Sequence, residues 1–207
     1  MEIRRLLWML VCLANFEEGL CGKLVNFDES HLASVPEDIA PDVTLLSFND
    51  NDITRIRRTD FNDKYPDLTL LVLGENNITS IESGCFKGTI LEGLHLSSNK
   101  LTSIPDLHEV SNTLTKLSLN SNEIATIAVE ELSYLIKLTF LYLSNNRFTT
   151  LQDIAHFMPS LNELWLIENP LDCCCSNVWL KQIRTVSSVY NNNYIFSNIN
   201  KVIVWEW

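Results

Sequence analysis

The chain has 207 residues, of which 46% are hydrophobic, and this is enough apolar material for the core of one domain. Its formal net charge is −11. This acidic balance argues against a nucleic-acid-binding protein, which would carry a basic stripe. It also argues against an acidic partner, unless that partner binds to a local basic patch.

The N-terminal segment has the pattern of a secretion signal. Arg4 and Arg5 precede an apolar run over residues 6–14, an order that is typical of a signal peptide. The run is shorter than the roughly 20 residues that a membrane-spanning helix needs, and no later stretch is long and apolar enough. We expect residues 1–22 to be the signal peptide, cleaved after Ala14 or Gly22, with an ordinary N-terminal helix as the alternative.

Residues 23–42 contain an L-x-x-V-P run from Leu32 to Pro36 and then a second proline, Pro41. This pattern resembles the N-terminal cap of extracellular leucine-rich repeat proteins. The resemblance implies a cap with two disulfides, but only Cys21 is present and Phe27 stands where a cysteine is expected. We therefore expect packing, more than disulfides, to stabilise this cap.

Six asparagines recur at intervals of 23 to 25 residues across residues 43–169. Each follows apolar residues eight, five and three positions earlier and precedes another two positions later, which is the leucine-rich repeat L-x-x-L-x-L-x-x-N-x-L. We expect six repeats and an α/β solenoid, a horseshoe with a parallel β-sheet on its concave side and irregular segments or short helices on its convex side. The asparagines are Asn51, Asn76, Asn99, Asn122, Asn146 and Asn169.

Each part of the repeat has a predicted role. The L-x-L core alternates with period two, so it reads as a short strand with one buried face. A buried asparagine amide donates and accepts at once, so it can satisfy main-chain groups at the turn between adjacent repeats. Larger apolar residues ten or eleven positions after most asparagines are expected to line the back of the core: Phe61, Phe86, Leu132 and Phe157.

Asn77-Ile78-Thr79 is a glycosylation sequon. Asn77 lies between the ladder residue Asn76 and the inward-facing Ile78, so its side chain is expected to face solvent. In a secreted protein this position would carry a glycan.

The pattern N-P-x-x-C-x-C-x-x-x-W-L begins at Asn169 and continues into residues 170–184, which follow the last repeat. This resembles the opening of a cysteine-rich C-terminal cap and implies roles for Cys173, Cys175 and Trp179. The family pairs these cysteines with two later ones, and no cysteine follows Cys175. Residues 185–207 form an atypical tail, which is either a truncated or altered end or a divergent cap whose strand adds to the sheet. Without a C-x-x-C spacing or a second ligand pair, the cysteines do not predict a metal site.

Function is expected on the concave face, at the variable positions that flank the strand leucines. Phe140, Tyr142, Trp165 and Ile167 occupy such positions on neighbouring strands, so they should form one patch, and exposed aromatic residues are enriched at binding hot spots. The alternative is that the C-terminal tail covers this patch. His95 and Lys116 are further candidates on the same face, although His95 reads as a surface residue more than as a switch.

The resemblance to extracellular leucine-rich repeat proteins implies a secreted module that binds a protein ligand. The alternatives are the truncated ectodomain of a membrane receptor and an intracellular regulatory subunit. The histidines fall in separate elements, and no catalytic or phosphate-binding motif occurs. We therefore expect no enzyme activity, no cofactor and no metal, and an extracellular protein without a nucleic-acid partner.

Overall fold

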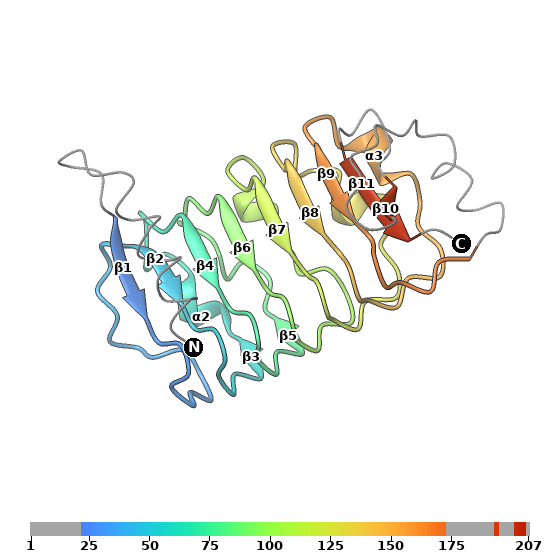
Figure 1. The fold of residues 1–207 in the computed structure, drawn as a ribbon. Helices are drawn as coiled ribbons and strands as arrows, with labels where there is room; N and C mark the ends of the chain where they lie inside the picture. The colour runs from blue at the N-terminus through green and yellow to red at the C-terminus, as the bar shows by residue number, and fades with distance from the viewer. Residues whose placement is uncertain (1–21, 173–192, 195–200, 206–207) are drawn as a thin grey trace.

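A parallel β-sheet runs along one side of the molecule in the computed structural model, which describes residues 22–172, 193–194 and 201–205 (Figure 1). Each repeat contributes one strand, and the sheet order is β1-β2-β4-β6-β7-β8-β9-β11-β10. The strands of this sheet are β1 (Lys23–Asn26), β2 (Val43–Ser47), β4 (Leu70–Val72), β6 (Gly93–His95), β7 (Lys116–Ser118), β8 (Phe140–Tyr142), β9 (Glu163–Trp165), β10 (Asn193–Tyr194) and β11 (Lys201–Trp205).

The strands are aligned so that equivalent residues of successive repeats face each other. Parallel pairing sets the central leucine of each strand beside that of the next, and these leucines are fully buried. Stacking buries a face that one repeat could not bury alone, and each leucine contributes roughly 1.5–3 kcal/mol. The register confirms the predicted solenoid. The aligned leucines are Leu46, Leu71, Leu94, Leu117, Leu141 and Leu164.

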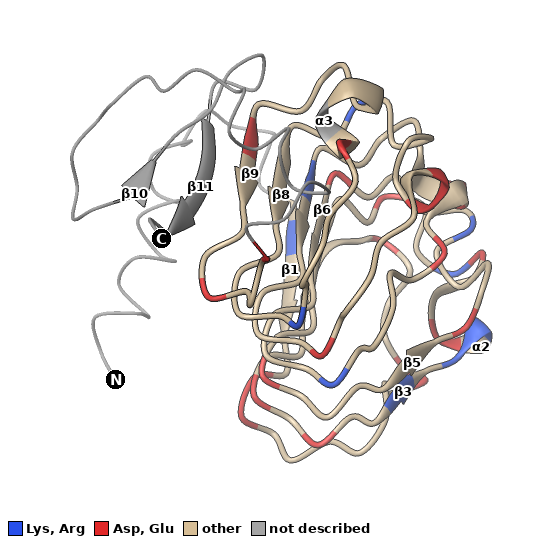
Figure 2. Cartoon of the chain, turned by 90° about the vertical axis from the view of Figure 1, so that its right-hand side faces the viewer, with Lys and Arg blue, Asp and Glu red and all other residues tan. Residues whose placement is uncertain are grey.

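Short elements cover the opposite, convex side. They include a second pair of parallel strands, which lies with α2 across the core from the main sheet (Figure 2). No helix in the described ranges exceeds four residues, in agreement with the expected irregular convex side. The elements are β3 (Arg55–Ile56), α2 (Arg58–Phe61), β5 (Ser80–Ile81), η1 (His108–Val110), η2 (Val129–Glu131) and α3 (Ile154–Phe157).

One residue expected at the back of the core is not there. Phe61, Phe86 and Leu132 are buried as predicted, but the prediction for Phe157 was wrong, because its side chain is 50% exposed. Ile154 and Met158 are buried instead. Ile154 begins α3 and Met158 directly follows its last residue, so the core contacts are made at the two ends of this short helix and Phe157 is left at the surface.

The N-terminal cap packs directly on the first repeat. β1 pairs with β2 in parallel, and the Phe27 ring stacks on Phe48 with ring centroids 5.3 Å apart. Phe27 thus contributes hydrophobic contact at the position where the family would have a cysteine.

At the other end, β11 pairs with β9 in parallel and β10 pairs with β11 in antiparallel orientation. This is the arrangement of the second alternative for the tail, in which a strand adds to the sheet. The predicted signal peptide, except its last residue, lies outside the described residues, as do Cys173, Cys175 and Trp179 of the predicted C-terminal cap.

Candidate recognition surface

A ladder of asparagines fixes the edge of the sheet where the strands end. Asn122 shows the pattern: its Nδ2 donates to the Leu96 carbonyl at 2.9 Å and to the Leu119 carbonyl at 3.1 Å, and its Oδ1 accepts from the Leu101 amide at 3.0 Å. Each amide thus joins two repeats through buried main-chain groups. The carbonyls are shared, since Leu96 also accepts from Asn99 Nδ2 at 3.1 Å, whereas the Leu101 amide, among the described residues, depends on Asn122 alone. Equivalent bonds are made by Asn76, Asn99, Asn146 and Asn169.

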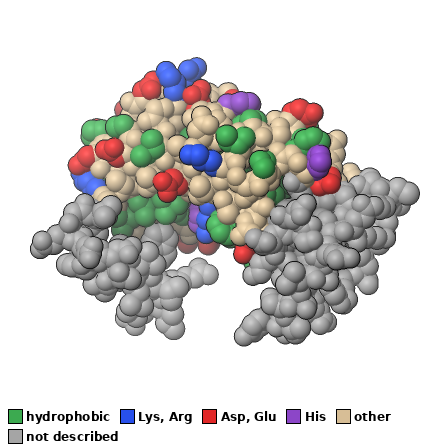
Figure 3. Space-filling model, turned by 90° about the horizontal axis from the view of Figure 1, so that it is seen from above, with side chains coloured by type: hydrophobic (Ala, Val, Ile, Leu, Met, Phe, Trp, Pro, Cys, Tyr) green, Lys and Arg blue, Asp and Glu red, His purple; other side chains and the backbone are tan. Residues whose placement is uncertain are grey.

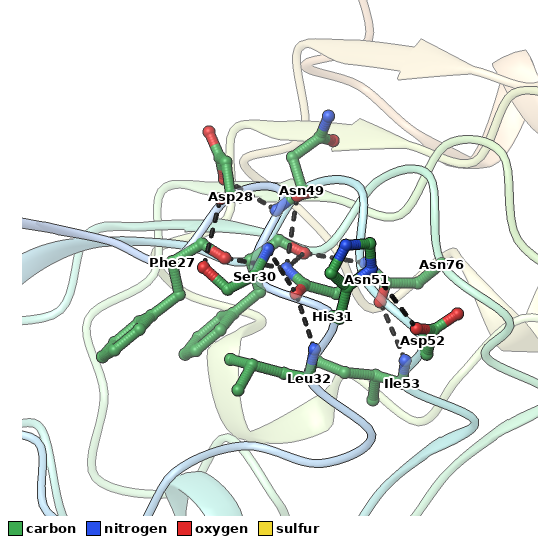
Figure 4. Close-up of polar contacts among 11 residues, drawn as sticks. Phe27, Asp28, Ser30, His31, Leu32, Asn49, Asn51, Asp52, Ile53 and Asn76 are labelled. Atoms are coloured by element: carbon green, nitrogen blue, oxygen red, sulfur yellow. Dashed lines mark hydrogen bonds and ion pairs between the residues drawn. The ribbon is translucent and has the colours of Figure 1, made fainter.

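Asn51 extends the ladder into the N-terminal cap (Figure 4). Its Oδ1 accepts from the amides of Ser30 and Leu32, and its Nδ2 donates to the Phe27 carbonyl at 2.9 Å. The Asp28 carboxylate adds two bonds to the first repeat, one from the Ser47 hydroxyl at 2.6 Å. The cap is therefore held by hydrogen bonds as well as by ring stacking.

The residue before each ladder asparagine has a left-handed backbone, with φ between 52° and 58°. This conformation turns the chain sharply away from the strand, and it is uncommon for residues other than glycine. Three of these residues are acidic, and acidic residues lie along this edge in Figure 2. The six residues are Asp50, Glu75, Ser98, Ser121, Asn145 and Glu168.

Two aromatic rings lie side by side on the concave face. Tyr142 of β8 is directly opposite Trp165 of β9, and their ring centroids are 5.8 Å apart at an interplanar angle of 47°. Phe140 lies two residues before Tyr142 and so on the same face of the strand. All three side chains are half-buried. We call Phe140, Tyr142 and Trp165 the aromatic patch.

Two further residues border the aromatic patch. Glu163 is opposite Phe140, and its carboxylate accepts a hydrogen bond from Trp165 Nε1 at 3.2 Å. Burial, together with the charge of Glu163, raises the pKa of Tyr142. Ile167 lies beyond the end of β9 and is also half-buried, and its carbonyl accepts from the Asn145 amide at 2.7 Å.

His95 and Lys116 lie next to this patch, on β6 and β7. Lys116 Nζ is 5.5 Å from the centroid of the Tyr142 ring, which is a cation–π contact. His95 is half-buried, because it sits mid-sheet between Val72 and Ser118 of the neighbouring strands. Burial, and then the positive charge of Lys116, lower the pKa of His95 to about 4. The imidazole is therefore neutral at pH 7, and it is less of an ordinary surface residue than the sequence suggested.

A space-filling view from above shows basic and histidine side chains beside hydrophobic ones on the side where the sheet lies (Figure 3). A second apolar group lies nearer the N-terminus, where Leu24, Leu45 and Leu70 follow one another across β1, β2 and β4. Leu24 is 45% exposed. The sequence alone does not indicate that Leu24 belongs to this group, because β1 is part of no repeat. Only the pairing of β1 with β2 places Leu24 beside Leu45.

A polar cluster on the convex side does not have the geometry of a catalytic site. Asp106 accepts from the Ser83 hydroxyl and bonds to His108 Nδ1 at 2.7 Å, and the His108 ring stacks on Tyr134 at 3.7 Å. The carboxylate stands between the serine and the histidine, so the imidazole is not placed to take the serine proton. The bond from Ser83, followed by that from His108, lowers the pKa of Asp106.

The predicted glycosylation sequon at Asn77 takes part in hydrogen bonds to the preceding repeat. Asn77 is half-buried, and its main-chain amide donates to the Ile53 carbonyl at 3.0 Å, while the Thr79 side chain donates to the Thr54 carbonyl. Within the described ranges no three histidine, cysteine or acidic side chains come together as metal ligands. Among the same residues, no helix has the length and hydrophobicity needed to span a bilayer.

Comparison with known proteins identifies the repeats. A family model described as leucine rich repeat matches residues 66–112, and a second with the same description matches residues 137–157. Both segments fall inside the six predicted repeats.

Three relatives share more of the chain. Biglycan from Sus scrofa is 32% identical over 140 residues, which cover 67% of this chain and 51% of biglycan. Asporin from Bos taurus is 29% identical over 142 residues, covering 67% of this chain and 38% of asporin. Nephrocan from Mus musculus is 32% identical over 160 residues, covering 77% of this chain and 31% of nephrocan. The chain thus spans about half, or less, of the length of each relative.

These relatives are non-enzymatic matrix proteins, in agreement with the prediction that the chain is not an enzyme. The solenoid register, the asparagine ladder and the matching repeats lead to one assignment. The chain is a leucine-rich repeat protein related to the small leucine-rich proteoglycans biglycan, asporin and nephrocan, which are secreted.

Proposed function

We propose that the chain is a secreted recognition module that binds a protein ligand on its concave face, through the aromatic patch. The observation that carries this proposal is the pair of half-exposed rings, Tyr142 and Trp165, side by side on a sheet. The relatives are secreted extracellular matrix proteins, which supports an extracellular setting.

The scaffold favours such a role on physical grounds. Aromatic side chains offer a large contact area with few rotatable bonds, so little conformational entropy is lost when they bind a partner. The strand β8 beneath the rings pairs with β7 on one side and β9 on the other, and the hydrogen bonds of Asn146 and Asn169 hold the adjoining turns. A ligand would therefore meet a surface that is already ordered, which reduces the cost of binding.

Quantitative capture of proteins from native extracellular fluid tests the binding site. We expect Tyr142→Ala and Trp165→Ala to lose at least tenfold of the signal of any specific ligand, since hot-spot truncations cost about 2 kcal/mol or more. Phe157→Ala is the matched control, because Phe157 is an exposed aromatic residue outside the concave face. Capture profiles that are the same for wild type and both patch variants would refute the proposal.

Secretion and glycosylation need a separate experiment. When the full chain is expressed in mammalian cells, we expect it in the medium, beginning at residue 15 or 23 and carrying a glycan on Asn77. N-terminal sequencing and the mass shift on glycosidase treatment measure both, with Thr79→Ala as the unglycosylated control. Retention of Met1 together with an unmodified Asn77 would instead favour an intracellular protein.

A further inference from the structure

His95 and Lys116 lie next to each other on the concave face, on β6 and β7. Leu94 and Leu117 are opposite each other and point into the core, so the flanking residues of both strands face outward. Lys116 is paired with Gly93 and His95 with Ser118, which makes His95 and Lys116 diagonal neighbours on adjacent strands. Gly93, which lies opposite Lys116, has no side chain, and the end of the Leu70 side chain occupies the space above it. A Cβ added at Gly93 would lie 2.7 Å from Leu70 Cδ1.

Lys116 is oriented but keeps its capacity to pair with an anion. The Tyr142 ring attracts the ammonium group through its face without accepting a conventional hydrogen bond. Among the described residues, no carboxylate lies within ion-pair distance of Lys116. The nearby Ser118 hydroxyl bonds to the Ser97 hydroxyl at 2.6 Å, so these two groups partly satisfy each other.

His95 is sensitive to any charge that arrives beside it. From β7 it is faced by Lys116 and Ser118, and from β4 by the apolar Val72. Burial and Lys116 keep the imidazole neutral, with one N–H donor. A carboxylate placed between the two residues would accept from both, offset the charge of Lys116 and favour protonation of His95.

We propose that His95 and Lys116 bind one Asp or Glu side chain of the protein ligand, while Tyr142 and Trp165 contact an apolar side chain next to that acid. This inference rests on the proposed function and specifies the chemistry of its ligand. The concave face would then bind a protein segment in which a single acidic residue has an apolar neighbour.

The charges of the molecule favour a single carboxylate over a polyanion. The formal charge of the chain is −11, so a sulfated or uronate-rich polysaccharide would be repelled along most of its length. One acid in an otherwise neutral or basic protein segment meets the local positive charge without this repulsion.

A small carboxylate with an apolar ring, 3-phenylpropionate, is a direct probe, and 3-phenylpropanamide is its uncharged match. We expect the carboxylate to bind the full chain with a Kd on the order of millimolar, as its size allows. In nuclear magnetic resonance titrations at pH 7, its largest shifts should fall on the His95 imidazole, the Lys116 side chain and the Trp165 indole. Lys116→Gln should weaken binding about fivefold, and Lys100→Gln, a change at an exposed lysine outside this site, should not.

The pH dependence separates this site from general attraction to lysines. Between pH 7.5 and 5.5, binding of 3-phenylpropionate to the wild type should tighten as His95 takes up a proton in the complex, and this trend should vanish in His95→Gln. Shifts spread over many surface lysines, equal binding of the amide, or tighter binding of a heparin oligosaccharide would each overturn the inference. If Tyr142→Ala abolishes ligand capture while Lys116→Gln leaves it intact, the inference fails and the proposed function stands.

Discussion

Single asparagines connect the sequence pattern to the stability of the fold. We expect Asn122→Ala to lower the free energy of unfolding by about 1–3 kcal/mol, because the buried Leu101 amide would lose its acceptor. Urea unfolding of the variant measures this loss. Asn112→Ala is the control, since Asn112 lies exposed in a turn outside the ladder. An equal loss of unfolding free energy in the two variants would show that a ladder asparagine stabilises the fold no more than an exposed one.

His95 gives the concave face its own response to acid. Its pKa is about 4 in the folded chain and near 6.5 when unfolded, so the unfolded chain binds more protons between these values. The stability associated with a neutral His95 is therefore complete above pH 6.5 and is lost as the pH falls towards 4.

We expect His95→Gln to reduce the acid sensitivity of the fold for this reason. The urea midpoint of the wild type should fall between pH 7 and pH 5 by more than that of the variant. His156→Gln, at an exposed histidine on α3, should behave like the wild type. A wild-type pH dependence that is unchanged in His95→Gln would contradict the assignment of this effect to His95.

Some elements of the fold could be predicted from the sequence and others could not. The strands of the repeats were predictable because L-x-L has the period of a strand and recurs with the asparagine. Phe157 was misplaced because its distance from Asn146 fits the repeat, while Ile154 at the start of α3 and Met158 just after its end are the residues that are buried. β1 and β11 carry no repeat pattern, so only pairing with β2 and β9 reveals them.

The same holds for the candidate site. The aromatic patch was predictable, since alternation alone places Tyr142 and Trp165 on one face of adjacent strands. The neutral state of His95 and the contact of Lys116 with the Tyr142 ring were not, because they depend on burial and on side-chain direction across β6, β7 and β8.

The N-terminal cap is the element whose stability is easiest to test alone. Phe27→Ala removes the ring that stacks on Phe48 and should cost about 2–4 kcal/mol of cap stability. Hydrogen exchange should then speed up at amides that join the cap to the first repeat, such as Glu29, which donates to the Asn49 carbonyl. Leu24→Ala, at an exposed position of the same cap, should leave these rates nearly unchanged. Equally slow exchange in Phe27→Ala would mean that the hydrogen bonds of Asp28 and Asn51 hold the cap without the ring.

At the scale of the whole molecule, each repeat contacts chiefly its neighbours, because the sheet order follows the chain from β1 to β9. In such a stack the stability is close to a sum of repeat and interface contributions. A defect in the middle therefore weakens two interfaces and separates the flanking halves, whereas a defect near an end leaves most interfaces intact.

Leu117 and Leu46 allow this to be measured, since both are fully buried central leucines of their strands. We expect Leu117→Ala, in the middle of the stack, to cost about 2–5 kcal/mol and to broaden urea unfolding into two steps that different probes resolve. Leu46→Ala should cost a similar amount at the N-terminal end, with the remaining repeats unfolding in one transition. Hydrogen exchange of the β8 and β9 amides and of the β2 and β4 amides reports the two ends separately. If both variants unfold in one transition by both probes, coupling extends over the whole sheet, and the concave face is held as one unit by all its repeats.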